Sequence, residues 1–174
     1  MADAPDLIKV TRHRDLRGRL GQIWVRRSLM SLVAALPIVG LFNVFGQRPA
    51  TSIGNAPKAQ LKVYAPTHLR GGLLFSARFR IEAKQDLKKA TLILDSGWAE
   101  GMGINTIEPS PLGQGSSNGK LVFQLGHIPA GKQYLLFMQF QVNPTNVGYR
   151  SQDVTLADGS TALVTLHRNV TVYP

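Results

Sequence analysis

The hydrophobic and polar positions of the chain follow two different patterns. Residues 28–46 form an unbroken apolar run without a charged side chain, and the few polar residues of the run lie near its ends. From Lys58 onward apolar and polar residues alternate, most clearly over 73–81 and 134–142. The first pattern predicts one long apolar helix. The second, with a period of two, predicts strands that each bury one face.

The apolar run has the features of a transmembrane helix. At about 1.5 Å per residue it extends roughly 28 Å, close to the ~30 Å hydrocarbon core of a bilayer. Pro37 lies in its middle, which disfavours a soluble helix but is tolerated in a membrane span, and no face of the run is polar. A secretory signal usually has a shorter apolar stretch and a small-x-small cleavage site. We therefore expect a retained single span over 28–46, with a cleaved signal and a buried core helix as the less favoured interpretations.

Basic residues are distributed unevenly around the predicted span. The segment before it, 1–27, contains Lys9, Arg12, Arg14, Arg17, Arg19, Arg26 and Arg27, whereas 47–66 contains only Arg48, Lys58 and Lys62. Because positive charge accumulates on the cytoplasmic side, this asymmetry predicts a cytoplasmic N-terminus. The rest of the chain then lies outside the cell (plasma or inner) membrane, and the protein is a single-pass membrane protein.

Two interpretations of the basic segment stay open. Apolar residues at helical spacing, with arginines between them, favour a short helix lying on the inner leaflet. Gly18 and Gly21 favour a charge cluster without fixed structure. In either case we expect anionic lipid headgroups to be contacted by Arg17, Arg19, Trp24, Arg26 and Arg27. Gly40 is a candidate for close packing of the span against a second helix.

The remaining sequence predicts a linker followed by a β domain. Residues 47–57 are rich in Pro, Gly, Ser and Thr, which is typical of a linker. Residues 58–174 contain about eight short alternating segments separated by turn signals, which predicts an antiparallel, Ig-like β-sandwich. The expected strands are 60–65, 73–81, 90–95, 105–108, 121–125, 134–142, 154–156 and 162–172. The stretch 109–119 is expected to be a mobile surface loop.

One stretch of this domain carries a resemblance. The sequence "GKLVFQLGHIPAGKQYLLFMQFQVNP" resembles the strand–"G.IPAG"–strand stretch of Ig-like sandwich ectodomains of bacterial surface and envelope proteins. The resemblance implies the fold of residues 58–174 and a single-span envelope protein, and it implies no particular activity. The Cys…Trp…Cys signature of true immunoglobulin domains is missing, because the chain contains no cysteine.

Composition narrows the partners and the chemistry. The chain has 20 Lys+Arg against 10 Asp+Glu, and the resulting net charge of +10 suits nucleic acid, an acidic protein or anionic lipid. With a membrane beside the basic segment, anionic lipid of the inner leaflet is favoured and nucleic acid is not expected. The absence of cysteine excludes disulfides, thiolate metal sites, Cys nucleophiles and attached c-type haem.

Residues typical of catalysis form no pattern in the sequence. The four histidines lack the close spacing of a zinc site, and no G-x-S-x-G nucleophile motif is present. His127 and Met138 have a spacing that resembles part of copper-carrier motifs, but the accompanying His-x-Met is missing. The carboxylates of the outer domain lie at predicted strand ends and turns. We expect no enzyme activity, no metal and no cofactor.

Some residues are candidates for contact with another protein. Leu74, Leu135 and Phe137 are apolar positions on strands whose buried face is already filled, so either a second layer of the domain or a partner must cover them. Trp98 lies in a predicted loop, where it either contacts a partner or plugs one end of the sandwich. Cationic side chains along the polar face of one strand favour an ordinary solvated surface: Arg78, Arg80 and Lys84.

These expectations combine into two functional hypotheses. In the first, the protein is a non-catalytic accessory or structural subunit of a larger bacterial membrane protein complex, with partner contacts through Trp98, Leu135 and Phe137. In the second, it is a stand-alone envelope binding module that recognises a glycan, a lipid or a soluble ligand. The sequence identifies neither the complex nor the ligand.

Overall fold

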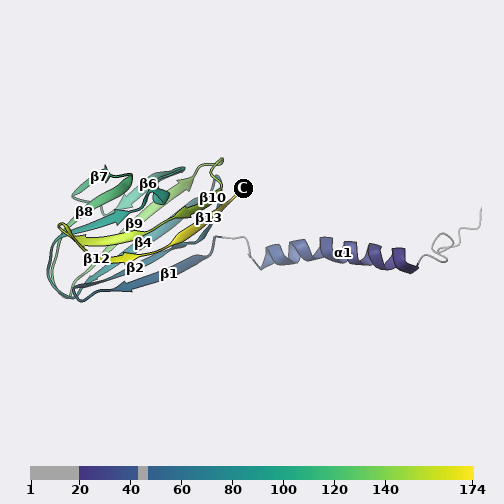
Figure 1. The fold of residues 1–174 in the computed structure, drawn as a ribbon, viewed down its shortest axis with the longest axis horizontal. Helices are drawn as coiled ribbons and strands as arrows, with labels where there is room; N and C mark the ends of the chain where they lie inside the picture. Colours follow the sequence, from purple (N-terminus) through teal and green to yellow (C-terminus); the bar gives the residue numbers. More distant parts are fainter. Residues whose placement is uncertain (1–19, 43–46) are drawn as a thin grey trace, which may run out of the picture. The chain divides into compact units, whose positions relative to one another are not determined.

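The structure, a computed structural model, describes residues 20–42 and 47–174. The chain divides into two compact units, Met1–Val44 and Phe45–Pro174. In the first unit the described residues form one helix, α1 (Leu20–Leu41), which contains Pro37 (Figure 1). Its side chains from Gly21 to Leu41 are exposed, apart from the half-buried Ile23. An apolar helix with exposed sides is consistent with a single membrane span or a signal sequence.

The helix differs from the predicted span at its start. It begins at Leu20 rather than Ser28, so Trp24, Arg26 and Arg27 are part of the helix and lie exposed on it. The guanidinium carbon of Arg27 lies 5.9 Å from the centre of the Trp24 ring. Arg17, Arg19 and the predicted last residues of the span, 43–46, lie outside the described residues.

The second unit consists of short strands. They are β1 (Pro49–Asn55), β2 (Ala59–Pro66), β3 (His68–Arg70), β4 (Leu74–Ala83), β5 (Leu87–Leu94), β6 (Met102–Glu108), β7 (Gly113–Ser117), β8 (Lys120–Ile128), β9 (Gln133–Val142), β10 (Gly148–Ser151), β11 (Val154–Asp158), β12 (Thr161–Leu166) and β13 (Asn169–Tyr173). A 3₁₀ helix, η3 (Ser96–Trp98), follows β5.

These strands form three sheets (Figure 1). The first has the order β1-β2-β4-β9-β6 and the second the order β12-β11-β5-β8-β7, and neighbouring strands in both are antiparallel. The third is small, with the order β10-β13-β3, and its β13–β3 pair is parallel. The prediction of a mainly β, sandwich-like domain with antiparallel sheets after an apolar helix is therefore confirmed.

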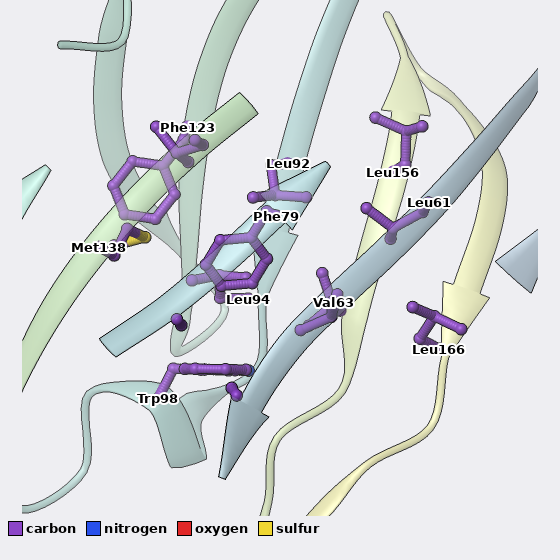
Figure 2. Close-up of a cluster of buried hydrophobic side chains, with 14 of the residues drawn as sticks. Leu61, Val63, Phe79, Leu92, Leu94, Trp98, Phe123, Met138, Leu156 and Leu166 are labelled. Carbon is purple, nitrogen blue, oxygen red and sulfur yellow. The ribbon is translucent and has the colours of Figure 1, made fainter. Parts of the chain in front are cut away.

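The core lies between the two larger sheets, as the alternation predicted. Figure 2 shows Leu61, Val63 and Phe79 from the first sheet beside Leu92 and Leu94 from the second, and all five are fully buried. Buried and more exposed side chains alternate along most of each of these strands, with an interruption in β5 at Lys88 and Lys89, where its register with β8 shifts. Burial of such side chains stabilises a fold by about 1.5–3 kcal/mol each.

Two segments predicted to be irregular are strands in the structure. The predicted linker 47–57 contains β1, which pairs along its whole length with β2 and belongs to the domain. Its inward positions carry small residues, and a Cβ added at Gly54 would lie 2.6 Å from Val164 Cγ2 of β12. The predicted loop 109–119 contains β7, an edge strand of the second sheet. Both predictions were wrong because neither strand has hydrophobic alternation.

Trp98 is the core residue at one end of this layer. It is fully buried near Phe79 (Figure 2). Its ring centre lies 5.3 Å from that of Phe79 and 5.4 Å from that of Phe140. Its Nε1–H donates a hydrogen bond of 3.0 Å to the carbonyl oxygen of Gln152. The expectation that Trp98 contacts a partner from a loop was therefore wrong, because no part of the ring reaches the surface. The alternative, a plug at one end of the sandwich, describes its position.

A buried cation completes this end of the core. Arg168 is 4% exposed, its guanidinium carbon lies 5.7 Å from the centre of the Trp98 ring, and Nη2 donates to the carbonyl oxygen of Ala65 at 2.8 Å. Its Nε and Nη1 make no hydrogen bond within the described residues. Burial lowers the pKa of Arg168 from its ordinary value, because it disfavours the charged form.

Candidate binding surface

The outward side of the first sheet carries a groove of about 360 Å³. We call this groove, with its lining residues, the outer groove. The lining comes from four neighbouring strands: Thr51 of β1, Lys62 and Tyr64 of β2, Arg78 and Arg80 of β4, and Leu135 and Phe137 of β9. On β2, β4 and β9 these positions alternate with core residues, so the same backbone that builds the core also holds most of the groove.

Strand register arranges six of these residues in two rows. Lys62 pairs with Arg80, and Arg80 with Leu135, in the first row. In the second row Tyr64 pairs with Arg78, and Arg78 with Phe137. Directly opposed residues on antiparallel strands have Cβ atoms about 4.5–5.5 Å apart. Each row therefore leads from β2 through a cation on β4 to an apolar side chain on β9.

The cations of the groove have no acidic partner. Among the described residues Lys62, Arg78 and Arg80 form no ion pair. The guanidinium carbon of Arg78 lies 5.9 Å from the centre of the Tyr64 ring. A carboxylate in the next row, Glu82, accepts a hydrogen bond of 3.0 Å from the Nε2 amide of Gln133. The groove is thus a patch of positive charge whose cations have no ion-pair partner among the described residues, although Glu82 lies two positions from Arg80 on β4 and Glu108 of β6 is the register partner of Phe137.

Apolar side chains lie beside these cations. Leu135 is 48% exposed, Tyr64 is 40% exposed, and Phe137 is half-buried. Ile53 of β1, the register partner of Lys62, is also exposed. The second large sheet packs on the opposite side of the first, so it does not cover these residues. The sequence left open whether a second layer of the domain or a partner covers Leu135. Among the described residues of the domain, no second layer covers it.

The structure joins features that the sequence kept separate. Leu135 and Phe137 were predicted contact residues, while Arg78 and Arg80 were interpreted as an ordinary solvated face. Pairing of β4 with β9 brings the two sets together. Lys84 does not join them, since its Nζ donates to the carbonyl oxygen of Ala56 at 3.2 Å.

Sequence reasoning missed the part of the groove on β1 and β2. Lys62 and Tyr64 occupy alternate positions of a predicted strand and were therefore detectable as outward-facing residues. Their place beside Arg80 and Arg78 depends on the pairing of β2 with β4, which a single sequence does not specify. Thr51 was missed because β1 was not predicted as a strand.

Other polar side chains of the domain form pairs at the surface. The Nε2 of His127 lies 2.6 Å from Oδ1 of Asp86, and the Nδ1 of His167 lies 2.7 Å from Oδ2 of Asp153. Among residues 20–42 and 47–174, no group of three or more His, Cys, Asp or Glu side chains is placed to hold a metal ion. Met138, considered with His127 as a copper pair, is fully buried in the core.

Gly40 of α1 has open space beside it, since an added Cβ would meet nothing within 4 Å. Its role in packing against a second helix stays a prediction.

Fold and site together define a mainly β, sandwich-like domain with a basic and apolar groove, preceded by an N-terminal apolar helix. No protein-family model matches the chain, and no curated protein matches it in sequence. Among solved structures, the chain is similar to part of the GH20 exo-β-N-acetylglucosaminidase from Vibrio harveyi, solved in complex with N-acetylglucosamine. The match has 14% identity and a TM-score of 0.32, and it covers 73% of this chain but only 18% of that enzyme.

Proposed function

We propose that this protein is a non-catalytic accessory or structural subunit of a larger bacterial membrane protein complex, which it contacts through the outer groove. The observation that carries the proposal is the exposure of Leu135 in a groove that no other part of the second unit, as the structure describes it, covers. Apolar groups that stay exposed within a rim of polar residues are typical of protein–protein contact sites. The groove lining contains no carboxylate, histidine or cysteine, which fits contact better than acid–base chemistry.

In this proposal α1 is retained as a membrane anchor with the N-terminus in the cytoplasm. Its 22 residues extend roughly 33 Å, of which the uncharged part after Arg27, 28–41, extends roughly 21 Å, and the predicted span 28–46 as a whole matches a ~30 Å hydrocarbon core. Arg26 and Arg27 lie within the helix, so their long side chains must extend toward the inner headgroups, with Trp24 at the same level. The intact mass of the membrane-bound protein tests retention, because cleavage of a signal would remove the helix.

The test of partner contact uses the full chain with a C-terminal tag, purified in a mild detergent from the cells that produce it. A native gel and mass spectrometry then identify stoichiometric partners. We expect Leu135→Ala to reduce the amount of partner retained. Leu74→Ala is the matched control, because Leu74 is 49% exposed on the same sheet but does not line the groove. Purification of a lone protein of its own mass would contradict the proposal.

The size of the groove favours a second candidate function, a stand-alone envelope binding module. A volume of about 360 Å³ lies within the range of roughly 300–1,000 Å³ typical of small-ligand sites. In this case the protein purifies alone, and a glycan, lipid or soluble ligand stabilises it against unfolding. The same purification distinguishes the two functions.

A further inference from the structure

The positive charges of the outer groove lie where they are expected to destabilise the free domain. Lys62 and Arg80 face each other directly across β2 and β4, and Arg78 lies two residues further along β4. Like charges directly opposite each other in an antiparallel pair are destabilising. No carboxylate among the described residues forms an ion pair with any of the three. A ligand that supplies negative charge would therefore gain attraction and also relieve repulsion.

Across the groove the cations, with Tyr64 beside them, are followed by a strand whose groove residues are apolar. The cations lie on β2 and β4, while Leu135 and Phe137 lie on β9. Along each strand the groove residues are two positions apart, which corresponds to about 6.5–7 Å. An extended peptide repeats with the same spacing, and its successive side chains point to opposite sides. A peptide lying along the groove can thus place acidic residues on one side and apolar residues on the other.

From this arrangement we infer that the outer groove binds an extended segment of a partner protein in which acidic and apolar residues alternate. The carboxylates lie over Lys62, Arg78 and Arg80, and the apolar side chains cover Leu135 and Phe137. The inference rests on the proposed function and names the chemistry of the partner. An acidic glycan would neutralise the cations but would leave the apolar side of the groove without a complement.

Site-specific photocrosslinking in the full chain tests this inference. A benzoylphenylalanine placed at Leu135 is activated in the producing cells, the tagged protein is purified, and the crosslinked product is identified by mass spectrometry. We expect a peptide with acidic residues two positions apart and an apolar residue between them. In Lys62→Gln/Arg80→Gln we expect at least about a tenfold lower yield of the adduct, since charge pairs at an interface contribute strongly to affinity. About 0.5 M NaCl present during crosslinking should lower the yield of the adduct as well, because salt screens the charges of the groove.

Two control variants separate binding from folding and from general charge. Arg70→Gln/Lys88→Gln removes the same charges from exposed positions on the two other sheets and should leave the yield unchanged. Lys62→Arg/Arg80→Lys keeps the charge of the groove and should retain most of the adduct. A thermal melt of each variant verifies that it folds.

Each contrary result overturns a defined part of the argument. Three results would refute binding of an acidic segment. They are an adduct with the mass of a glycan or lipid, a crosslinked peptide without acidic residues, and an adduct yield that Lys62→Gln/Arg80→Gln does not change. If a partner co-purifies but no adduct forms at Leu135, this inference fails while the accessory-subunit function stands. If no partner co-purifies at all, the proposed function itself fails.

Discussion

Strands β2, β4 and β9 have an inner face that the second sheet covers and an outer face that no sheet of the described domain covers. On the inner face Leu61, Phe79 and Leu136 are fully buried, since the second sheet covers them. On the outer face the same strands place Lys62 opposite Arg80 and leave Leu135 half exposed. The inner face is satisfied by this chain alone, whereas the outer face holds opposed charges and apolar surface that folding does not use. The inner face therefore explains the fold, and the outer face is where function is to be sought.

The largest expected effect contrasts a buried aromatic residue with an exposed apolar one. Trp98→Ala should lower the free energy of unfolding by about 3–5 kcal/mol, because it empties a fully buried site between Phe79 and Phe140. Leu135→Ala should change it by no more than about 0.5 kcal/mol, because its side chain is half exposed. Urea unfolding followed by circular dichroism measures both. Similar losses in the two variants would mean that Leu135 also belongs to the core.

The next largest effect on stability is expected from a pair of glycines, one buried and one exposed. A Cβ at the buried Gly97 would lie 1.9 Å from the carbonyl oxygen of Ser151, so Gly97→Ala should destabilise the domain by about 1–3 kcal/mol. Gly103 points outward on β6, where an added Cβ meets nothing within 4 Å. Gly103→Ala should be neutral or stabilise by about 0.4–1 kcal/mol, since it restricts the unfolded chain. Thermal unfolding of both variants measures the contrast, and a Gly103→Ala variant as unstable as Gly97→Ala would refute it.

The two faces were not equally predictable from the sequence. Hydrophobic alternation identified inner positions such as Phe79 and Leu136, because burial requires an apolar residue at every second position. The same alternation marks outer positions only as not buried, and it cannot tell a solvated cation from one in a groove. The outer groove depends on which strands are neighbours, and Lys62 meets Arg80 through pairing between β2 and β4. Leu135 and Phe137 were detectable because apolar residues break the alternation on that face.

The largest errors of prediction have a related cause. Trp98 was placed in a loop, with partner contact and a plug at one end of the sandwich left open, and a short 3₁₀ helix in fact turns its ring into the core. The strand β1 was taken for a linker because its inward residues are small, as the close approach of β12 at Gly54 requires. In both places the deciding contact is with a segment distant in sequence, so local composition did not reveal it.

A smaller effect is expected from the opposed cations of the outer face. Lys62→Gln/Arg80→Gln should raise the free energy of unfolding by about 0.2–1 kcal/mol, because it removes repulsion between directly opposed like charges. Arg70→Gln/Lys88→Gln removes the same charges from separate sheets and should not raise it. Thermal unfolding at low ionic strength gives the clearest difference, since salt screens the repulsion. A loss of stability in the first variant would show that these cations serve the fold rather than a partner.

The smallest effect concerns a carboxylate at the buried end of the domain. Asp95 precedes η3, and its pKa is lowered from 3.8 by hydrogen bonding of the Ser151 side chain, against the opposing effect of partial burial, with further contributions from the Ser96 backbone and Lys120. The Nζ of Lys120 lies 3.4 Å from Oδ1 of Asp95. Because the folded-state pKa is lower, this stabilisation is present above about pH 3.8 and is lost as the pH falls through the folded-state value.

Asp95→Asn should therefore lower the free energy of unfolding at pH 7 and reduce its decline on acidification. For Lys120→Gln, the free energy of unfolding at pH 7 should lie between those of the wild type and Asp95→Asn, because this variant leaves the Ser151 contact in place. Urea unfolding at pH 7 and at about pH 3 measures the difference for each protein. An equal decline in the wild type and in Asp95→Asn would show that ionised Asp95 does not contribute to stability at this end of the core. The acid sensitivity of the domain would then have another source than Asp95.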